Sequence, residues 1–235
     1  MIRVMVVDDE KLLRAGIRSI LEAEPDIEVP VACEGVRAVE LAVAHRPDVV
    51  LLDIRMPEVD GLSVLGSLLA LPEPPVVAML TTFSGDEHIA PALRAGAAGF
   101  LVKDTVPEEL ASAVRILAAG GTVLSPAVAN SVVDGYLRAG GGAPPARLAS
   151  LTDRERAVLT LLAQGKSNAE IGAALLMGAA TAKDHVSAIL AKLGAANRVQ
   201  AAVLAHHHGL VRLDLESEGA SGGARGGRPD AAGPA

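Results

Sequence analysis

The sequence has no tryptophan, one tyrosine and two phenylalanines, so its cores have to be built from aliphatic side chains. Half of the 235 residues are hydrophobic, and this length suits two small domains better than one large domain. A single cysteine, Cys33, excludes an internal disulfide and is typical of a reducing cytoplasm. No apolar run approaches the ~20 residues of a membrane span, and the N-terminus MIRVMVVDDE lacks the pattern of a secretory signal. We therefore expect a cytoplasmic protein without a membrane partner.

Positive charge is scarce in the first half of the chain. Residues 1–138 contain 11 Lys and Arg against 20 Asp and Glu, whereas residues 151–212 contain 7 against 4. An acidic half joined to a mildly basic half predicts different partners for the two, with polyanion binding favoured for the second. The positive excess is too small to indicate DNA binding by itself.

Five short apolar runs alternate with segments of helical periodicity in the first half. The runs are residues 2–9, 27–33, 47–53, 74–80 and 99–104. Repeated strand–helix units predict a parallel sheet covered on both faces. Pro30 would interrupt a hydrogen-bonded ladder, so its strand belongs at an edge, as in a flavodoxin-like strand order 2-1-3-4-5. The prediction is a doubly wound α/β domain over residues 1–122.

The remainder of the chain divides by composition. Residues 123–150 combine a connecting helix (125–139) with a Gly- and Pro-rich linker, and residues 213–235 form a low-complexity, disordered tail. Residues 151–212 show no strand pattern. Thr152 with Glu155 and Ser167 with Glu170 have the spacing of capping boxes, and tight turns are expected at Gln164-Gly165 and Met177-Gly178. This pattern predicts an all-α bundle of three or four helices that contains a helix-turn-helix candidate.

Acidic side chains follow two strands that the predicted order makes neighbours. Asp8 and Asp9 end the first strand and Asp53 ends the third, so their carboxylates should share one crevice. Three carboxylates repel one another unless a cation is present, and hard oxygen ligands suit Mg²⁺. Lys103 ends the fifth strand and Thr81 the fourth, which adds a fixed positive charge and a hydroxyl at the same edge. This set predicts phosphoryl transfer, with Asp53 as the nucleophile and Lys103 and the metal as charge stabilisers.

These motifs resemble a known family. VVDDE, LLDIRMPEVDGL, LTTF and GAAGFLVKD are similar to the receiver domain of bacterial response regulators. The resemblance implies that a sensor histidine kinase phosphorylates Asp53. It further implies Mg²⁺ ligation by Asp9, Asp53 and the backbone carbonyl of Arg55, with Asp8 acting through water. Thr81 and Phe100 match the switch pair of the family, Lys103 its phosphate-binding lysine, and Pro57 and Gly61 the turn after the acceptor.

Four alternatives stay open for this half. Phe100 has the properties of an ordinary core aromatic, and Thr82 stands next to Thr81 as a substitute. A haloacid-dehalogenase-like phosphotransferase also has a nucleophilic Asp after an apolar strand, but it needs an acid two residues later, where this sequence has Arg55. Pro91 lies within a predicted helix (85–96), so that helix either starts late, with Pro91 in its first turn, or is kinked.

The second half resembles the four-helix LuxR-type DNA-binding domain from Leu151 to about Ala205, on LTDRERAVLTLLAQGKSNAEIGAALLMGAATAKDHVSAILAKLG and ANRVQAAVLA. With the receiver, this similarity indicates a NarL/FixJ-type response regulator. Gly178 stands where the family usually has a Ser cap. Periodicity alone leaves a protein-binding bundle open as an alternative. The third helix of this domain is expected to lie in the DNA groove and is called the reading helix below. The predicted DNA contacts are residues of this helix and its neighbours: Lys166, Ser167, Asn168, Thr181, Lys183, Asp184, Ser187, Lys192 and Arg198.

The reading helix divides into two faces. Ala182, Val186, Ile189, Leu190 and Leu193 are spaced to pack inward, which leaves the polar residues outside. With so few positive side chains, one copy should bind DNA weakly, and two copies on paired half-sites are needed. The run from His206 to His208 cannot readily ligate one ion, because consecutive helical residues point to different faces.

The sequence thus predicts a transcriptional regulator, not an enzyme beyond its own phosphoryl transfer and autodephosphorylation. Phosphorylation of Asp53 is expected to turn Thr81 and Phe100 inward and shift the protein to a dimer that binds promoter DNA. Unphosphorylated, the receiver either covers the helical domain or leaves it monomeric. RNA polymerase is a candidate partner. The alternative is a phosphorylation-independent or protein-binding regulator whose output switch is degenerate.

Overall fold

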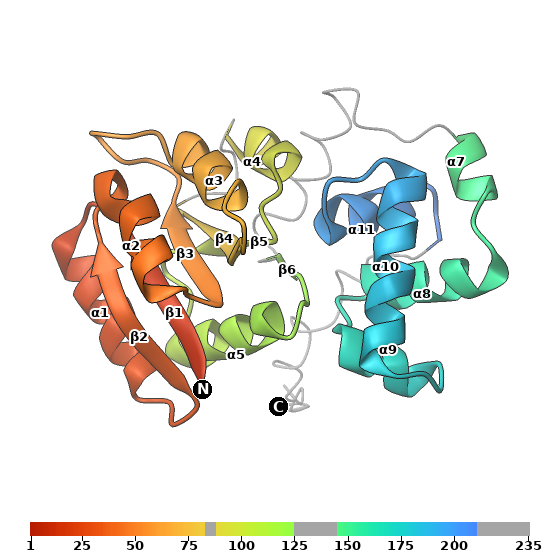
Figure 1. Ribbon diagram of the computed structural model, residues 1–235, viewed down its shortest axis with the longest axis horizontal. Coiled ribbons are helices and arrows are strands. Elements are labelled where there is room, and N and C mark those ends of the chain that lie inside the picture. The colour runs from red at the N-terminus through yellow and green to blue at the C-terminus, as the bar shows by residue number, and fades with distance from the viewer. Residues whose placement is uncertain (83–87, 125–144, 211–235) are drawn as a thin grey trace, which may run out of the picture.

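The computed structural model describes residues 1–82, 88–124 and 145–210, which form two domains (Figure 1). The sheet domain, residues 2–124, contains the strands β1 (Ile2–Val7), β2 (Ile27–Cys33), β3 (Val49–Asp53), β4 (Val76–Thr81), β5 (Gly99–Val102) and β6 (Val123–Leu124). Its helices are α1 (Lys11–Glu22), η1 (Gly35–Arg37), α2 (Ala38–His45), α3 (Gly61–Leu69), α4 (Ile89–Ala95) and α5 (Pro107–Ala118). The helical domain, residues 145–210, contains α7 (Pro145–Ala149), α8 (Asp153–Ala163), α9 (Asn168–Ala174), α10 (Ala179–Leu193) and α11 (Arg198–His207).

The strands form one sheet in the order β2-β1-β3-β4-β5-β6, and every pair is parallel. The predicted doubly wound fold and the order 2-1-3-4-5 are confirmed. A sixth strand, β6, was not predicted. It pairs only Val123 and Leu124 with β5, and two residues are too few to produce a periodic pattern.

Pro30 lies in β2, which is an edge strand as predicted. The register of β1 against β2 shifts between Arg3, which faces Glu28, and Met5, which faces Val31. Pro30 therefore falls in the irregular part of the ladder, where its missing N–H does not cost a regular hydrogen bond.

Helices cover both faces of the sheet. One apolar cluster joins the strands to α1 and α5, through Ile17, Leu21 and Leu110 among others. The other joins them to α2, α3 and α4, through residues such as Ala42, Leu65 and Leu93. All five residues of β3 are buried, as expected for a central parallel strand with helices on either side. This packing fixes the end of β3, and with it Asp53, more firmly than a surface loop would.

Pro91 is the third residue of α4, which begins at Ile89. The late start expected as one alternative is therefore what the structure shows, and the kink is not needed. A proline in the first turn costs little, because the N–H groups there have no partner within the helix. The consequence is a helix of only seven residues between β4 and β5.

Both predicted capping boxes are present in the helical domain. The Thr152 side chain accepts from the Glu155 backbone and the Ser167 side chain from the Glu170 backbone, and each glutamate bonds back to the cap residue. The four helices α8 to α11 confirm the predicted bundle, and α7 precedes them within the segment predicted as a linker. The predicted connecting helix (125–139) and tail (213–235) lie outside the described residues. Among the described helices, none has both the length and the hydropathy that a membrane span requires.

The two predicted turns differ in outcome. Gly165 has a φ of +80°, as a left-handed turn residue should. In the second turn the left-handed residue is Leu176, with a φ of +55°, and its side chain is 95% exposed. Gly178 instead has a φ of -69° and is the N-cap of α10, without a side chain to cap it.

Substituting Gly178→Ser is expected to stabilise the protein by a few tenths of a kcal/mol, since serine is a slightly better N-cap than glycine. The added side chain has room, because the nearest atom to a Cβ at this position is the Thr181 Oγ1 at 4.0 Å. Chemical denaturation of both proteins would measure the difference. Gly178→Ala is the matched control, because it adds a Cβ but no cap, and a gain equal to that of serine would contradict a capping effect.

Candidate functional sites

The acidic residues at the ends of β1 and β3 come together as predicted. Val7 pairs with Leu52 across the two strands, so Asp8 and Asp53 emerge side by side. One carboxylate oxygen from each of Asp8, Asp9 and Asp53 lies within 4.8 Å of the other two. Asp8 and Asp53 are buried, and Asp9 is half-buried. The cluster is therefore a concentrated negative charge largely withdrawn from water.

Lys103 supplies the compensating positive charge from the end of β5. Its Nζ lies 2.9 Å from Asp8 Oδ2 and 3.0 Å from Asp53 Oδ2, with Glu10 Oε1 at 3.4 Å on the exposed side. Burial by itself would lower the pKa of Lys103, but the hydrogen bonds to Asp8 and Asp53 outweigh it and raise that pKa above its ordinary value. Lys103 is thus held as a cation between the two buried carboxylates.

Burial also raises the pKa of Asp53, and the hydrogen bond from Lys103 offsets only part of that effect. The backbone N–H of Arg55 donates to Asp53 Oδ1 at 3.3 Å. Asp53 is therefore an oriented carboxylate whose charge the protein stabilises incompletely. Such a group gains from a further cation or from covalent modification.

The residues fit a divalent cation. The donor set is made of carboxylate oxygens, the ligands that Mg²⁺ prefers. Asp8 Oδ2 is buried and, apart from its ion pair with Lys103, has no hydrogen-bond donor. A hollow of about 570 Å³, lined by Asp9, Arg55 and Pro57 among others, opens beside the cluster and gives access from solvent.

Thr81 ends β4 and is buried, while Thr82 follows the strand and is exposed. Thr81 pairs with Val102 on β5, one residue before Lys103, and its carbonyl accepts from the Lys103 backbone N–H at 2.8 Å. Of the two threonines, Thr81 is therefore the one that lies among the strand ends of the cluster. The position of Thr81 favours this residue over Thr82 as the threonine of the predicted switch pair.

Phe100 lies in the core and is fully buried, in the apolar cluster that also contains Ile89 and Leu93 of α4. Of the two roles considered for this residue, a core aromatic is therefore what the packing shows, and the inward movement expected on phosphorylation stays a prediction.

Gly61 shapes the turn after Asp53, as predicted. A Cβ at this position would come within 2.3 Å of the Asp53 backbone oxygen and 2.7 Å of the Ile54 oxygen. Only glycine allows this close approach of the loop to the end of β3. Asp60 then caps α3 by accepting from the Leu62 backbone N–H.

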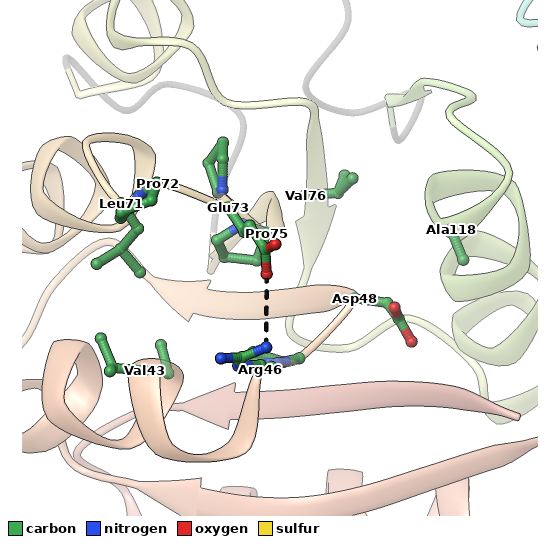
Figure 2. Close-up of a pocket in the computed structure, with 12 residues that line it drawn as sticks. Val43, Arg46, Asp48, Leu71, Pro72, Glu73, Pro75, Val76 and Ala118 are labelled. Atoms are coloured by element: carbon green, nitrogen blue, oxygen red, sulfur yellow. Dashed lines mark ion pairs between the residues drawn. The ribbon is translucent and has the colours of Figure 1, made fainter.

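A second hollow, of about 620 Å³, lies at the opposite end of the sheet (Figure 2). Asp48 and Val76, beside the N-terminal ends of β3 and β4, are among its lining residues, and Arg46 and Glu73 form an exposed ion pair of 3.9 Å across it. The strand ends that present Asp8 and Asp53 are on the other side of the molecule. This hollow is therefore separate from the acidic cluster.

The two faces of α10 are as predicted. Ala182, Val186, Ile189 and Leu193 are buried, and Leu190 is half-buried. The outward residues are exposed: Thr181, Lys183, Asp184, Ser187 and Lys192. Polar side chains that could meet a nucleic acid thus share one accessible face of the longest helix in the domain.

The flanking residues that were expected to contact DNA phosphates differ from one another in exposure and in ion pairing. Lys166 is exposed and pairs with Glu170 at 3.2 Å, and Lys192 pairs with Glu155 at 2.7 Å. Ser167 is buried as the cap of α9, Asn168 is half-buried, and Arg198 is buried with 8% exposure. The structure therefore does not support phosphate contacts from Ser167 and Arg198 in this arrangement, because neither reaches the surface.

The histidine run ends α11. His206 Nε2 lies 3.0 Å from the Ala163 carbonyl oxygen of α8, and the rings of His207 and His208 meet edge to face. His206 therefore ties α11 to α8, which is a structural contact.

Comparison with known proteins agrees with this arrangement. Residues 4–115 match the family described as response regulator receiver domain, and residues 149–205 match bacterial regulatory proteins of the luxR family. The transcriptional regulatory protein LiaR of Bacillus subtilis is 40% identical over 212 residues, which cover 90% of this chain and all of LiaR. The chain is a NarL/LiaR-type response regulator.

Two further relatives illustrate this family. The nitrate/nitrite response regulator protein NarL of Escherichia coli is 36% identical over 204 residues, covering 86% of this chain and 94% of NarL. A solved two-component response regulator of the LuxR family from Aurantimonas sp. SI85-9A1 is 26% identical with a TM-score of 0.53, covering 57% of this chain and 97% of that one. This response regulator thus combines a receiver, the sheet domain, with a LuxR-type DNA-binding domain, the helical domain, and belongs to a family of transcriptional regulators.

The residues that join the two domains were not predicted from the sequence. Asn197 and Gln200 of the helical domain bond to backbone oxygens of the receiver, and Arg198 bonds to Gly120. Arg198 was assigned to DNA, and no role was predicted for Asn197 or Gln200. A signal was present, since three of the four residues from Asn197 to Gln200 are polar and the next five residues of the helix are apolar, but the sequence does not say what the polar residues face.

Proposed function

We propose that this response regulator accepts a phosphoryl group on Asp53 from a sensor histidine kinase and then binds promoter DNA as a dimer. The observation that supports this proposal best is the pair of buried carboxylates, Asp8 and Asp53, with the half-buried Lys103 within 3.0 Å of both. The receiver would extend over residues 1–122, with 123–150 as connection, 151–212 as DNA-binding domain and 213–235 as tail. We place the protein in the cytoplasm.

In the transfer step, an Asp53 carboxylate oxygen attacks the phosphorus atom of the donor phosphohistidine. The P–N bond to the imidazole breaks as the new P–O bond forms, which leaves an acyl phosphate on Asp53. Lys103 stabilises the phosphoryl oxygens with its ammonium group, and Thr81 donates its hydroxyl to one of them. Asp8, Asp9, Asp53 and the Arg55 carbonyl would hold Mg²⁺, which supplies charge neutralisation for the transferred group. Attack of water later returns Asp53 to its free form, so the only chemistry is on the protein itself.

The kinase has to bring its phosphohistidine to the rim of this crevice. A groove of about 350 Å³ between α1 and α5 is lined by Lys103 and by apolar residues that include Leu12, Leu13 and Leu110. Leu12 is 87% exposed, which is unusual for a large apolar side chain next to a reactive site. We assign this groove to the kinase.

We propose that DNA is contacted by Thr181, Lys183, Asp184 and Ser187 on the outward face of α10, with Lys166, Asn168 and Lys192 at its flanks. All four residues of α10 are exposed. One copy offers few positive charges, so its affinity should be low and its salt dependence shallow. A dimer on paired half-sites doubles the number of phosphate contacts and the salt slope, and it binds much more tightly because the free energies of the two half-sites add. RNA polymerase is a candidate partner at the promoter.

The test of this function begins with the full-length protein treated with acetyl phosphate and magnesium. Selection of bound duplexes from a random pool should yield a sequence with two half-sites. Titration of that duplex should show tighter binding by the treated than by the untreated protein. Equal binding by both would indicate a phosphorylation-independent regulator, and failure to enrich any duplex would contradict DNA binding.

Lys183→Ala is expected to weaken binding to the selected duplex by about 1–3 kcal/mol if the side chain reads a base edge. Asp184→Ala should relax the preference at one base pair and leave the affinity for other sequences unchanged or higher, because a carboxylate near phosphates is repulsive. Competition titrations with single-base variants of the duplex measure both effects. Lys11→Ala, an exposed lysine of α1, is the control. Unaltered binding in both α10 variants would show that this face does not read DNA.

A further inference from the structure

Leu176, in the turn between α9 and α10, combines backbone strain with an almost fully exposed apolar side chain. Its φ is +55° and the residue is 95% exposed. The left-handed region costs a leucine stability, because its Cβ comes too close to the following carbonyl oxygen, whereas glycine adopts the region freely. A single exposed leucine is common on protein surfaces, but a strained one gives the fold neither relief nor packing. Residues of this kind are concentrated at functional sites.

The backbone of this turn is held in place by both flanking helices and by α8. The Met177 N–H donates to the Gly172 oxygen of α9 at 2.8 Å, and a Cβ at Gly172 would come within 2.7 Å of the Met177 oxygen. The Arg154 side chain, from α8, donates to the Leu175 oxygen. The left-handed conformation of Leu176 is therefore imposed by the close approach of α9 and α10, and its side chain is held outside the bundle.

Leu176 lies at the end of the helical domain where α10 begins. Gly178 is the N-cap of α10, and Ala179 and Ala180, its first two residues, are exposed. In helix-turn-helix proteins the N-terminal residues of the reading helix contact base edges. The surface at this end of α10 is therefore apolar where the proposed function places the bases, and the polar residues of α10 lie further along the helix.

The chemistry of this surface limits what it can contact on DNA. Leucine and alanine side chains have no hydrogen-bond donor or acceptor, so they cannot pair with the polar edges of guanine, cytosine or adenine. Against a phosphate they would only remove water from the charge. The thymine 5-methyl group is the apolar group that bases present in the major groove, and apolar side chains contact it. Burial of this methyl group against a leucine would favour a thymine at that position.

We propose that Leu176 is a specificity residue that packs on the methyl group of one thymine in each half-site. Because this role requires α10 in the major groove, it rests on the proposed function. The side chains of Ala179 and Ala180 extend the same apolar surface. The protein thus reads its DNA with two chemistries, apolar contact from the turn and hydrogen bonds from the outward face of α10.

The duplex selected from the random pool by the full-length protein, treated with acetyl phosphate and magnesium, is the probe. Each half-site should contain a thymine that Leu176→Ala no longer selects. Uracil in place of this thymine removes only the methyl group, and in one half-site it should weaken wild-type binding about three- to fivefold, as expected for one buried methyl group. The same replacement should not affect Leu176→Ala. Val43→Ala, which truncates an exposed apolar residue of the receiver, should behave as the wild type.

Backbone strain gives a second readout that does not involve DNA. Leu176→Gly should bind the duplex as weakly as Leu176→Ala, yet its equilibrium constant for folding should rise about two- to fivefold, because the strain relieved exceeds the added entropy of the unfolded chain. Urea denaturation measures this change. Arg46→Gly is the matched control, since Arg46 also has a positive φ, +44°, but lies in the receiver. It should gain stability and bind the duplex as the wild type does.

Weaker DNA binding by a more stable protein cannot result from damage to the fold. If the wild type enriches a duplex that Leu176→Ala binds equally well, with thymine or with uracil, the role of Leu176 is wrong while DNA binding by α10 stands. Normal DNA binding by this variant with reduced transcription from a promoter that carries the duplex would show that Leu176 contacts a protein, which also overturns the proposal. Failure of the wild type to enrich any duplex would overturn the proposed function and the role of Leu176 together.

Discussion

The Asp53→Asn variant should take up no phosphoryl group from acetyl phosphate and should melt at a higher temperature than the wild type near pH 7. An amide oxygen is not a nucleophile for phosphoryl transfer, so the loss of uptake should be complete. The gain in stability follows because burial raises the pKa of Asp53, which means that the fold disfavours its charged form. Lys103 keeps its ion pair with Asp8 in the variant.

The pH dependence of this gain has a definite sign. A carboxylate whose pKa is raised by folding contributes stability that is fully present below its unfolded pKa of about 3.9 and is lost as the pH rises through its folded pKa. The neutral amide does not titrate. The variant should therefore exceed the wild type in melting temperature near pH 7, and the difference should shrink as the pH falls toward about 4.

Glu58→Gln is the matched control for Asp53→Asn, since Glu58 is an exposed acid in the loop that follows Asp53. It should accept a phosphoryl group like the wild type and melt at the wild-type temperature. Phosphate-affinity electrophoresis and thermal denaturation, both without magnesium and with it, give the two readouts. Phosphoryl uptake by Asp53→Asn would show that another residue is the acceptor. A lower melting temperature would contradict the claim that the fold disfavours the charged form of Asp53.

Lys103→Met should destabilise the protein by about 3–5 kcal/mol in the absence of divalent cations, because removal of one partner leaves buried charge uncompensated. Asp8 and Asp53 are both buried, and Lys103 is the cation that lies within 3.0 Å of each. Methionine keeps the length of the side chain, so the loss should come mainly from charge. Urea denaturation at neutral pH measures the free energy of unfolding.

Magnesium gives this prediction a second readout. A cation that binds only the folded state stabilises it by an amount that grows with the logarithm of the cation concentration above the Kd, and in Lys103→Met it has no competing ammonium group. Titration with Mg²⁺ should therefore raise the melting temperature of Lys103→Met more than that of the wild type. Lys11→Met controls for the loss of an exposed lysine. A variant that unfolds like the wild type without metal, or that does not respond to Mg²⁺, would argue against the cluster as a cation site.

The acidic cluster could be predicted from the sequence because its positions are fixed by strand ends. Once Asp8 and Asp53 follow adjacent parallel strands, the sheet geometry brings them together whatever the loops do. The capping boxes of α8 and α9 and the buried face of α10 were predictable for a similar reason, since they depend on spacings of three or four residues.

Other features depend on contacts between segments far apart in the chain. The sequence shows an aromatic residue on a strand at Phe100, but only the packing of α4 shows that its ring lies in the core. Arg198 was expected to contact DNA phosphates from an element next to the reading helix. It is buried instead, since Gly120, 78 residues earlier in the chain, offers a carbonyl at the domain boundary.

The sequence alone determined the two folds, the residues of the acidic cluster and the outward face of α10, because each follows from local periodicity or from the order of strands. The tertiary structure decided which surfaces are available. It covers α11, exposes α10 and joins the domains through Asn197 and Gln200, whose partners are backbone oxygens about 100 residues away. Backbone oxygens are the same in every residue, so no pattern of side chains could have identified them as the partners.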